Sequence, residues 1–253
     1  MTTPAPSDQL RDVYEARGRL EYAEPVTPDP TLDRKFEVLN DELRRLPRAN
    51  SLLDAGCGDG RYLAALPNLG PLPKRVVGVD IAESILQTAA LATSRAGVHA
   101  ELVRANLERL PLADSEFDLV LCFQAVEHLL DPEAGIQELA RVLAPGGTLL
   151  LTTDHRRNLI TKTLNAPRWL ALALVGKRRA RVQIQFPHGD FTKRELTRLM
   201  RDSGLDVART RTFRFYVAGA GPRLMRLCNR IDRLLPDVGV GDVLLVVARR
   251  PLT

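Results

Sequence analysis

The chain has 253 residues, of which 45% are hydrophobic and 26% charged, a composition typical of a soluble globular protein with a sizeable core. The sequence shows no basic N-terminal start followed by an apolar run, and its most apolar stretch, 169–175, is far shorter than the roughly 20 residues that cross a bilayer. The three cysteines show no metal-ligand or paired spacing. We therefore expect a cytoplasmic protein without a secretory signal, a membrane span or a metal site.

Charge is distributed unevenly along the chain. Residues 1–154 hold 15 lysines and arginines against 24 acids, whereas residues 155–253 hold 21 against 7. Eight basic residues and no acid occur within 155–189. This division predicts two tasks within one chain.

The first two thirds of the sequence alternate between helical and strand-like patterns. A short helix is expected around 8–19, and apolar residues at helical spacing predict a second one over 31–46. Apolar strands then alternate with helices, which is typical of a parallel sheet with helices on both faces. The strands are predicted at 51–56, 75–80, 98–106, 117–124 and 148–153, and the helices between them at 60–66, 82–95 and 131–143.

The alternation breaks after Thr153 and resumes near the C-terminus. Residues 155–190 are basic and do not alternate. A helix over 191–204 is predicted by the capping-box pair Thr192 and Glu195, and two late strands are predicted at 205–213 and 241–250. A second basic helical insertion lies between these strands, over 214–240.

The stretch SLLDAGCGDGRYLAAL, residues 51–66, combines a strand, a glycine loop and a helix start. Its spacing is G-x-G-x-G, with Arg61 where a dinucleotide-binding motif has its last glycine. Asp54 and Asp59 would repel a pyrophosphate bound there, and no second nucleotide-binding half follows. S-adenosyl-L-methionine (SAM) fits better than NAD, because its sulfonium and ammonium groups complement the acids and N–H groups at the helix start can bind its carboxylate.

Further candidates end the next two strands. Asp80 ends the second strand, where an acid can accept hydrogen bonds from both ribose hydroxyls of a bound nucleoside. Ile81 follows it and could pack against adenine. Asn106 ends the third strand, where it could reach the adenine edge, and Leu107 would flank the ring.

Four successive stretches resemble the ordered motifs of class I SAM-dependent methyltransferases: LLDAGCGDGRYL, VVGVDIAESIL, ANLERLPLADSEFDLVLCFQAVEHL and ELARVLAPGGTLLLTT. The most similar group is the small-molecule branch with the ubiquinone-biosynthesis-type enzymes (methyltransferase type 11), and the resemblance covers roughly 50–153. It implies an α/β fold with a Rossmann-like seven-stranded sheet, mostly parallel with the last strand antiparallel, helices on both faces, and basic helical insertions over the active edge. It also implies SAM as the cofactor, bound at the methionine end, the ribose, the adenine and the sulfonium by Asp54, Gly56, Cys57, Gly58, Asp80, Ile81, Asn106, Leu107 and Phe123.

A single methyltransferase domain over 1–253 is the expected organisation. Its parts are N-terminal helices or a lid (1–46), the SAM-binding core (50–153), two substrate-cap insertions (155–190 and 214–240) and the C-terminal part of the sheet (191–213 and 241–250). Tyr14 and Tyr22 could belong to the lid, although packed or exposed tyrosines are the simpler reading.

Three histidines are candidates for a general base in methyl transfer. His128 follows the fourth strand, His155 follows the fifth, and His188 precedes the helix over 191–204. Each also has a purely structural interpretation, as a packing residue for His128 and as a loop residue for the other two. Glu127 and Asp154 are weaker candidates for the same role.

The basic insertions leave the methyl acceptor open. They could be a solvated cationic face, could bind an anionic small molecule, or could dock on an anionic membrane surface, because GKRRAR (176–181) lies close to the apolar stretch RWLALALVG. Nucleic acid is not expected, because no aromatic residues are interleaved with the basic ones. A small-molecule methyltransferase is the favoured function; a non-catalytic SAM-fold protein and, below it, an NAD-dependent oxidoreductase are the alternatives.

Overall fold

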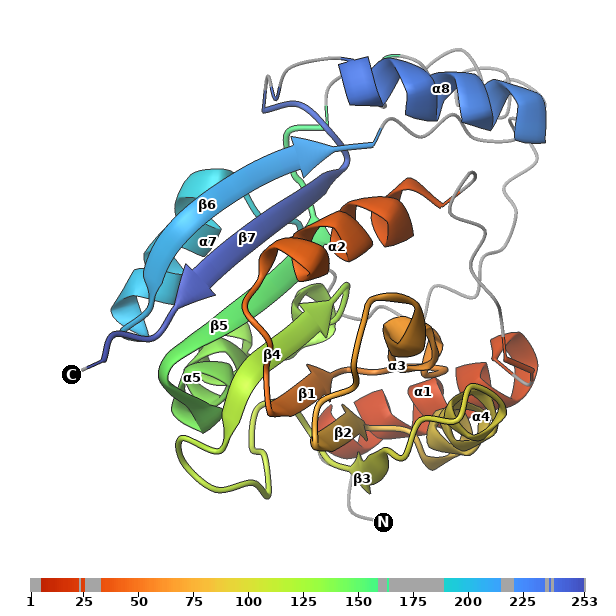
Figure 1. The fold of residues 1–253 in the computed structure, drawn as a ribbon, viewed down its shortest axis with the longest axis vertical. Helices are drawn as coiled ribbons and strands as arrows, with labels where there is room; N and C mark the ends of the chain where they lie inside the picture. Colours follow the sequence, from red (N-terminus) through yellow and green to blue (C-terminus); the bar gives the residue numbers. More distant parts are fainter. Residues whose placement is uncertain are drawn as a thin grey trace.

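A computed structural model describes residues 6–22, 24–25, 33–158, 163, 189–214, 221–234, 237 and 239–252. A seven-stranded sheet in the order β3-β2-β1-β4-β5-β7-β6 forms its centre (Figure 1). β7 is antiparallel to both of its neighbours, whereas the pairs from β3 across to β5 are parallel. The strands are β1 (Ser51–Ala55), β2 (Arg75–Asp80), β3 (Glu101–Arg104), β4 (Phe117–Phe123), β5 (Leu143–Asp154), β6 (Asp206–Phe213) and β7 (Val243–Arg249).

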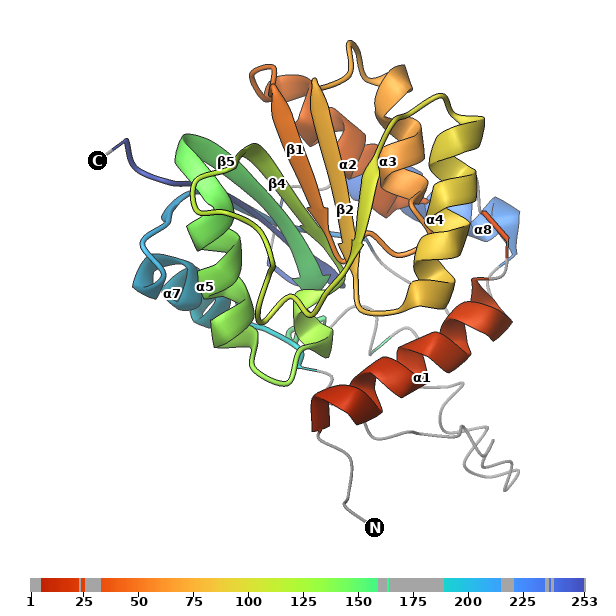
Figure 2. The ribbon, with the colours of Figure 1, turned by 90° about the horizontal axis from the view of Figure 1, so that it is seen from below.

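Helices cover both faces of this sheet, and α1 and α8 lie outside the two layers (Figures 1 and 2). On one face lie α2, α3 and α4, and on the other α5 and α7. The helices are α1 (Pro6–Glu21), α2 (Arg34–Arg45), α3 (Arg61–Ala65), α4 (Glu83–Arg95), α5 (Pro132–Val142), α7 (Lys193–Asp202) and α8 (Pro222–Leu234), with the 3-10 turns η1 (Leu66–Asn68) and η2 (Val126–His128). The predicted Rossmann-like fold class, with its antiparallel last strand, is confirmed.

Alternating strand residues feed two hydrophobic cores. Leu52 and Leu121 pack with α2, α3 and α4, whereas their neighbours Leu53 and Cys122 pack with α5 and α7. Because successive side chains of a strand point to opposite faces, an unbroken apolar run places one residue in each core. This explains why the core strands read as continuous apolar segments in the sequence.

Local signals in the sequence set several helix ends. The side chain of Asp131 accepts a hydrogen bond from Ala134 N–H and caps α5, and Thr192 with Glu195 forms the predicted capping box of α7. The third strand is shorter than expected, because β3 covers only Glu101–Arg104 of the predicted 98–106. It is an edge strand paired with β2 alone.

Two loops meet above the sheet where β1 and β4 end. Gly56 has a φ of +80°, and a Cβ at this position would lie 2.5 Å from the Cβ of Ala125. Only glycine allows this approach, because a side chain would be strained by the positive φ and would also collide. The carboxyl ends of the central strands thus converge on one place. Among the described residues, no helix has the length and apolar character needed to cross a membrane.

Candidate functional site

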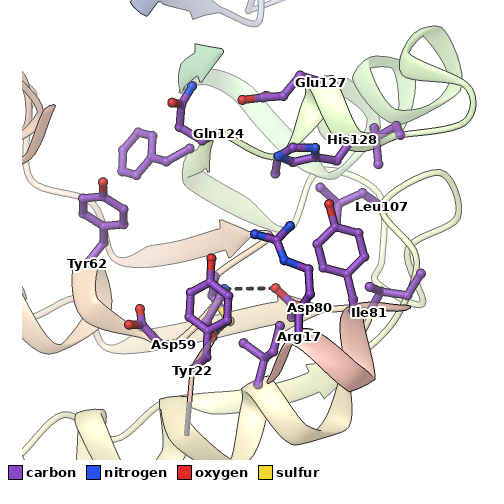
Figure 3. Close-up of a pocket in the computed structure, with 18 of the residues that line it drawn as sticks. Arg17, Tyr22, Asp59, Tyr62, Asp80, Ile81, Leu107, Gln124, Glu127 and His128 are labelled. Carbon is purple, nitrogen blue, oxygen red and sulfur yellow. Dashed lines mark hydrogen bonds between the residues drawn. The ribbon is translucent and has the colours of Figure 1, made fainter. Parts of the chain in front are cut away.

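A cavity of about 440 Å³ opens at the carboxyl ends of the parallel strands (Figure 3). The loops after β1, β2, β3 and β4 supply much of its wall, and side chains of α1 and α2 complete it. In an open α/β sheet this edge, near the reversal of strand order, is where ligands bind. The volume lies within the range of small-molecule and cofactor sites.

Most of the predicted site residues come together in this cavity. Its wall includes Gly56, Cys57, Gly58, Asp80, Ile81, Asn106, Leu107, Phe123 and His128. Asp54 and His155 are not part of the wall, and His188 lies outside the described residues. The roles assigned to all of these residues stay predictions.

Asp80 connects the glycine loop to the end of β2. Its Oδ2 accepts a hydrogen bond from Gly58 N–H at 3.0 Å, drawn as a dashed line in Figure 3, and its Oδ1 accepts one from Ala82 N–H at 3.1 Å. Gly58 has a φ of +54°, and a Cβ there would meet no atom within 4 Å. The loop therefore keeps open space beside its backbone while Asp80 fixes its shape.

The second acid of the loop differs from its sequence-based interpretation. Asp59 is buried and bound by its neighbour Arg61, whose Nε and terminal nitrogen donate to its two carboxylate oxygens at 2.8 and 2.7 Å. This bidentate pair neutralises the charge that we expected to attract a cationic ligand. The electrostatic argument against a pyrophosphate consequently loses its contribution from Asp59.

Asp54 lies beneath the loop rather than in the wall. It is fully buried, and neither of its carboxylate oxygens has a hydrogen-bond partner within the described part of the chain. Burial, followed by the charges of Asp80 and Asp59, raises the pKa of Asp54 to about 7. Near neutral pH this carboxyl is therefore divided between its neutral and charged forms.

The wall also includes the apolar side chains of Ile81 and Leu107 (Figure 3). Asn106, which we expected to reach the adenine edge, is engaged in its own loop. Its Oδ1 accepts a hydrogen bond from Glu108 N–H at 3.0 Å, and its Nδ2 donates to the Glu108 carboxylate at 3.3 Å. Asn106 thus shapes the β3 loop in this structure, although it still contributes to the wall.

Helix α1 closes one side of the cavity and is fixed there by Glu15. The two carboxylate oxygens of Glu15 accept hydrogen bonds from Glu83 N–H and Ser84 N–H, at 2.6 and 3.0 Å, and so cap the first turn of α4. A Cβ added at Gly18 would lie 2.2 Å from the Ser84 hydroxyl oxygen, so α1 and α4 pack closely. This docking brings Tyr14 and Tyr22, for which a place in a lid was the alternative to simple packing or exposure, into the wall.

Arg17, also on α1, extends its guanidinium toward the middle of the cavity (Figure 3). Its Nε and terminal nitrogen donate to the Glu21 carboxylate at 3.1 and 3.0 Å, and the group lies 5.5 Å from the Tyr14 ring centroid. Tyr14 in turn makes an edge-on contact with His128, at 6.0 Å between ring centroids. The sequence offers no signal for Arg17, because its place depends on how α1 docks.

A polar group occupies the end of the cavity next to β4. Lys35 of α2 donates from Nζ to the Gln124 side-chain oxygen at 2.6 Å. Gln124 has a left-handed φ of +52°, which is uncommon for a residue other than glycine, and its buried Nε2 has no partner among the described residues. Burial, followed by the charge of Arg214, lowers the pKa of Lys35. Gln124 is the last residue of a predicted strand, so the sequence could have indicated its position at the ligand-binding edge, whereas it gives no such indication for Lys35.

Glu127 and Asp154 line the cavity beside this pair. Glu127 is almost fully buried, and its Oε2 accepts a hydrogen bond from the Thr153 hydroxyl at 3.0 Å. Burial, assisted by the charge of Asp154, raises the pKa of Glu127 to about 8. At neutral pH its carboxyl is therefore mostly protonated and can donate a hydrogen bond into the cavity.

His155 occupies a different environment from the one expected. It is buried, with Nδ1 2.9 Å from the carbonyl oxygen of Gly241, and it forms a β-bridge with Phe191. The solvated-loop interpretation of this residue is wrong, since the loop packs against the start of α7. Of the two predicted histidines within the described residues, His128 is the one that lines the cavity.

Comparison with known proteins gives the site a chemical context. Residues 53–151 match the family model described as a methyltransferase domain. This segment is therefore similar to methyltransferase domains. A probable S-adenosylmethionine-dependent methyltransferase of Mycolicibacterium smegmatis is 35% identical to it over 123 residues, which are 49% of this chain and 45% of that one. A ubiquinone biosynthesis O-methyltransferase of Dinoroseobacter shibae is 33% identical over 161 residues, which are 61% of this chain and 59% of that one.

A solved structure extends the similarity beyond the matched segment at the level of the fold. The putative methyltransferase of Haloferax volcanii, solved with the Trm112 methyltransferase activator, superposes with a TM-score of 0.63 at 21% identity and covers 96% of both chains. The chain spans about half of the length of the curated relatives that it matches. The methyltransferase class and the SAM cofactor of the family, both predicted from the motifs, are confirmed at the level of the domain.

The chemistry of the wall fits this cofactor. Asp80, with a carboxylate held by two backbone donors, keeps lone pairs for hydroxyl groups, and Ile81 with Leu107 offers apolar surface for a base. The open space at Gly58 lets a ligand approach the loop backbone. The orphaned oxygens of Asp54 lie under the same loop, where a buried carboxyl without partners is costly unless a cation or water satisfies it.

Proposed function

We propose that this chain is a SAM-dependent methyltransferase acting on an oxygen, nitrogen or carbon atom of a small, anionic or lipid-linked acceptor. The observation that carries the proposal is a single cavity with two chemically distinct ends. One end holds Asp80 and the glycine loop, and the other holds Lys35, Gln124 and Glu127. A methyl donor and an acceptor need adjoining places with these different chemistries. The division of 1–253 into core, lid and substrate-cap insertions belongs to the same proposal.

Asp80 would accept hydrogen bonds from the ribose hydroxyls, with Ile81 and Leu107 on the faces of the adenine. Arg17, whose guanidinium extends into the cavity, would bind the cofactor's carboxylate together with the backbone N–H groups that we expected in this role. Phe123, edge-on to Tyr62 at 4.9 Å between ring centroids, supplies an aromatic wall toward the sulfonium. The bound cofactor supplies an electrophilic methyl group on its sulfonium sulfur.

The acceptor would occupy the end lined by Lys35 and Gln124. The Gln124 Nε2 lacks a partner among the described residues, and Lys35 carries the positive charge beside it. Together they suit an acceptor with an anionic or carbonyl oxygen. Buried donors left unpaired cost free energy, so an acceptor that satisfies them would be favoured over an analogue without that oxygen.

His128 and Glu127 could move the acceptor's proton. His128 lines the cavity and is oriented by its contact with Tyr14. Glu127, protonated below about pH 8, can donate a hydrogen bond and becomes a base only as it ionises. The roles predicted for His155 and His188 have no comparable support, because the first lies outside the cavity wall and the second outside the described residues. A cytoplasmic location stays a prediction.

Calorimetry with S-adenosyl-L-homocysteine, with NAD as the competing ligand, tests the cofactor. We expect micromolar binding of the former and none of the latter. Asp80→Ala should weaken binding by about 100-fold, because it removes a charge-assisted pair of hydrogen bonds worth about 3 kcal/mol. Asp202→Ala, at an exposed site on α7, is the matched control and should leave affinity unchanged. Absence of binding by the native chain refutes the function, and unchanged binding by Asp80→Ala refutes the ribose placement.

A transfer assay tests the reaction itself. Radiolabelled methyl donor is incubated with the chain and metabolite fractions of the source cell, separated into anionic, neutral and lipid pools. Incorporation into an anionic or lipid pool supports the proposal. Tight binding of S-adenosyl-L-homocysteine without incorporation into any pool would favour a non-catalytic SAM-fold protein.

A further inference from the structure

Helix α8 exposes its apolar side and buries polar residues, the reverse of a helix that packs only against its own protein. The side chains of Leu224, Leu227, Ile231 and Leu234 are 44%, 52%, 45% and 85% exposed. Its buried residues are Asn229 and Asp232, which are both polar. A surface helix ordinarily buries its apolar stripe and exposes its polar face. The inversion indicates that the apolar stripe has a partner outside the described part of the chain.

The stripe is continuous along the helix. Its four residues follow one another at steps of three, four and three, so they share one side over about three turns, or roughly 15 Å. Isolated exposed leucines are ordinary, but a contiguous aliphatic patch marks an interaction site.

Arginines occupy the adjacent side. Arg223, Arg226, Arg230 and Arg233 each precede one of the four aliphatic residues and are exposed. Arg233 pairs with Glu37 of α2, whereas the other three make no salt bridge within the described residues. The one acid of the helix, Asp232, is buried against Arg34 and cannot neutralise them. The outer surface of α8 therefore joins an apolar stripe to uncompensated positive charge.

The polar side of α8 fixes it to the rest of the protein. Asp232 accepts hydrogen bonds from Arg34 Nε at 2.6 Å and from Arg214 N–H at 2.9 Å. Arg233 donates to both carboxylate oxygens of Glu37, at 2.7 and 2.8 Å. These bonds tie α8, the helix at the top of Figure 1, to α2, which also carries Lys35 of the cavity. The apolar stripe stays exposed to solvent.

We propose that α8 docks the protein on an anionic phospholipid surface, with the aliphatic stripe (Leu224, Leu227, Ile231 and Leu234) in the acyl boundary and Arg223, Arg226 and Arg230 on the lipid phosphates. An in-plane helix with an apolar face and an arginine-rich polar face is the pattern that such surfaces bind. A basic strip with no exposed acid favours a uniformly negative surface over a mixed protein one. The GKRRAR and RWLALALVG segments, considered above for the same role, lie outside the described residues. This inference is independent of the proposed methyl transfer.

Vesicle co-sedimentation of the full chain tests the proposal. Vesicles of phosphatidylcholine alone are compared with an equimolar mixture of phosphatidylcholine and phosphatidylglycerol. We expect binding to the mixture only, weakening as salt is raised. Replacing Arg223, Arg226 and Arg230 by Gln should weaken binding about 100-fold, at roughly fivefold per arginine. Leu227→Ser with Ile231→Ser should weaken it at least tenfold, since both side chains would leave the acyl boundary.

Matched controls lie elsewhere on the surface. Arg198→Gln on α7 and Leu252→Ser near the C-terminus alter residues that are also highly exposed, and both should bind as the native chain does. Every variant should keep its affinity for S-adenosyl-L-homocysteine, which separates loss of docking from loss of fold or of cofactor binding. The proposal is overturned if the native chain binds neither vesicle or if the α8 variants bind like the controls. A native chain that is dimeric by light scattering, becomes monomeric in the leucine variant and ignores vesicles would instead assign the stripe to a second copy.

Discussion

Replacing Asp54 by Asn should raise stability more at alkaline than at acidic pH. The folded state raises the pKa of this carboxyl from its ordinary value of 3.8 to about 7. Between these values the unfolded chain has released the proton that the folded chain retains, so the carboxyl lowers stability as pH rises. The loss is complete once the pH exceeds the folded pKa. The amide has the same shape and never ionises, so it escapes this loss.

The size of the effect follows from the pKa. About 1.5 pH units separate pH 5.5 from the folded pKa of about 7, and at 1.36 kcal/mol per unit this corresponds to about 2 kcal/mol. The stability difference between Asp54→Asn and the native chain, from urea unfolding, should therefore be about 2 kcal/mol larger at about pH 8.5 than at about pH 5.5. Comparing the two pH values cancels any effect of the amide that does not depend on pH. If the stability difference between Asp54→Asn and the native chain is the same at both pH values, the reasoning is refuted, and water or another donor must bind the Asp54 carboxyl.

Three further changes test other parts of the structure. Glu127→Gln should likewise gain unfolding free energy over the native chain as pH rises, here through about pH 8. In the transfer assay, the pH–rate profile of this variant should lack any rise in activity that depends on ionisation of Glu127. Gly56→Ala should lower unfolding free energy by about 3 kcal/mol, because its Cβ combines a positive φ with a 2.5 Å approach to Ala125; thermal unfolding that matches the native chain would show that the loop relaxes. Arg34→Met should cost about 3–5 kcal/mol in urea unfolding, because Asp232 would remain buried without its cationic partner, and a cost below 1 kcal/mol would contradict that explanation.

The sheet could be predicted largely from local patterns. The β2 bounds, Arg75–Asp80, coincide with the apolar run that predicted them, and Thr192 caps the helix that it was expected to cap. These signals act over a few residues, through backbone hydrogen bonds and side-chain periodicity. The edge strand β3 was overestimated, because a run paired on one side only is not extended by its neighbours.

The sequence predicted the charge of the glycine loop less well. Two acids in the motif suggested a negative loop, yet Arg61 neutralises Asp59 and burial raises the pKa of Asp54. Charge depends on which groups face each other and on how much water reaches them, and neither follows from the order of residues.

The sequence alone determined the class of fold, the order of its motifs and the family of its cofactor, because glycine spacing, strand-ending acids and apolar periodicity are local and leave a direct trace. Only the tertiary structure decided which side chains complete the cavity. Arg17 and Lys35 reach it from helices far away in the chain, and Lys35 meets Gln124 across 89 positions. The tertiary structure also decided that α8 turns its leucines outward. The amphipathic pattern alone would equally suit a helix that buries them, and it is the pairing of Asp232 with Arg34 that places the polar side inward. Contacts between distant segments depend on how whole elements pack, and this is the information that a linear pattern does not carry.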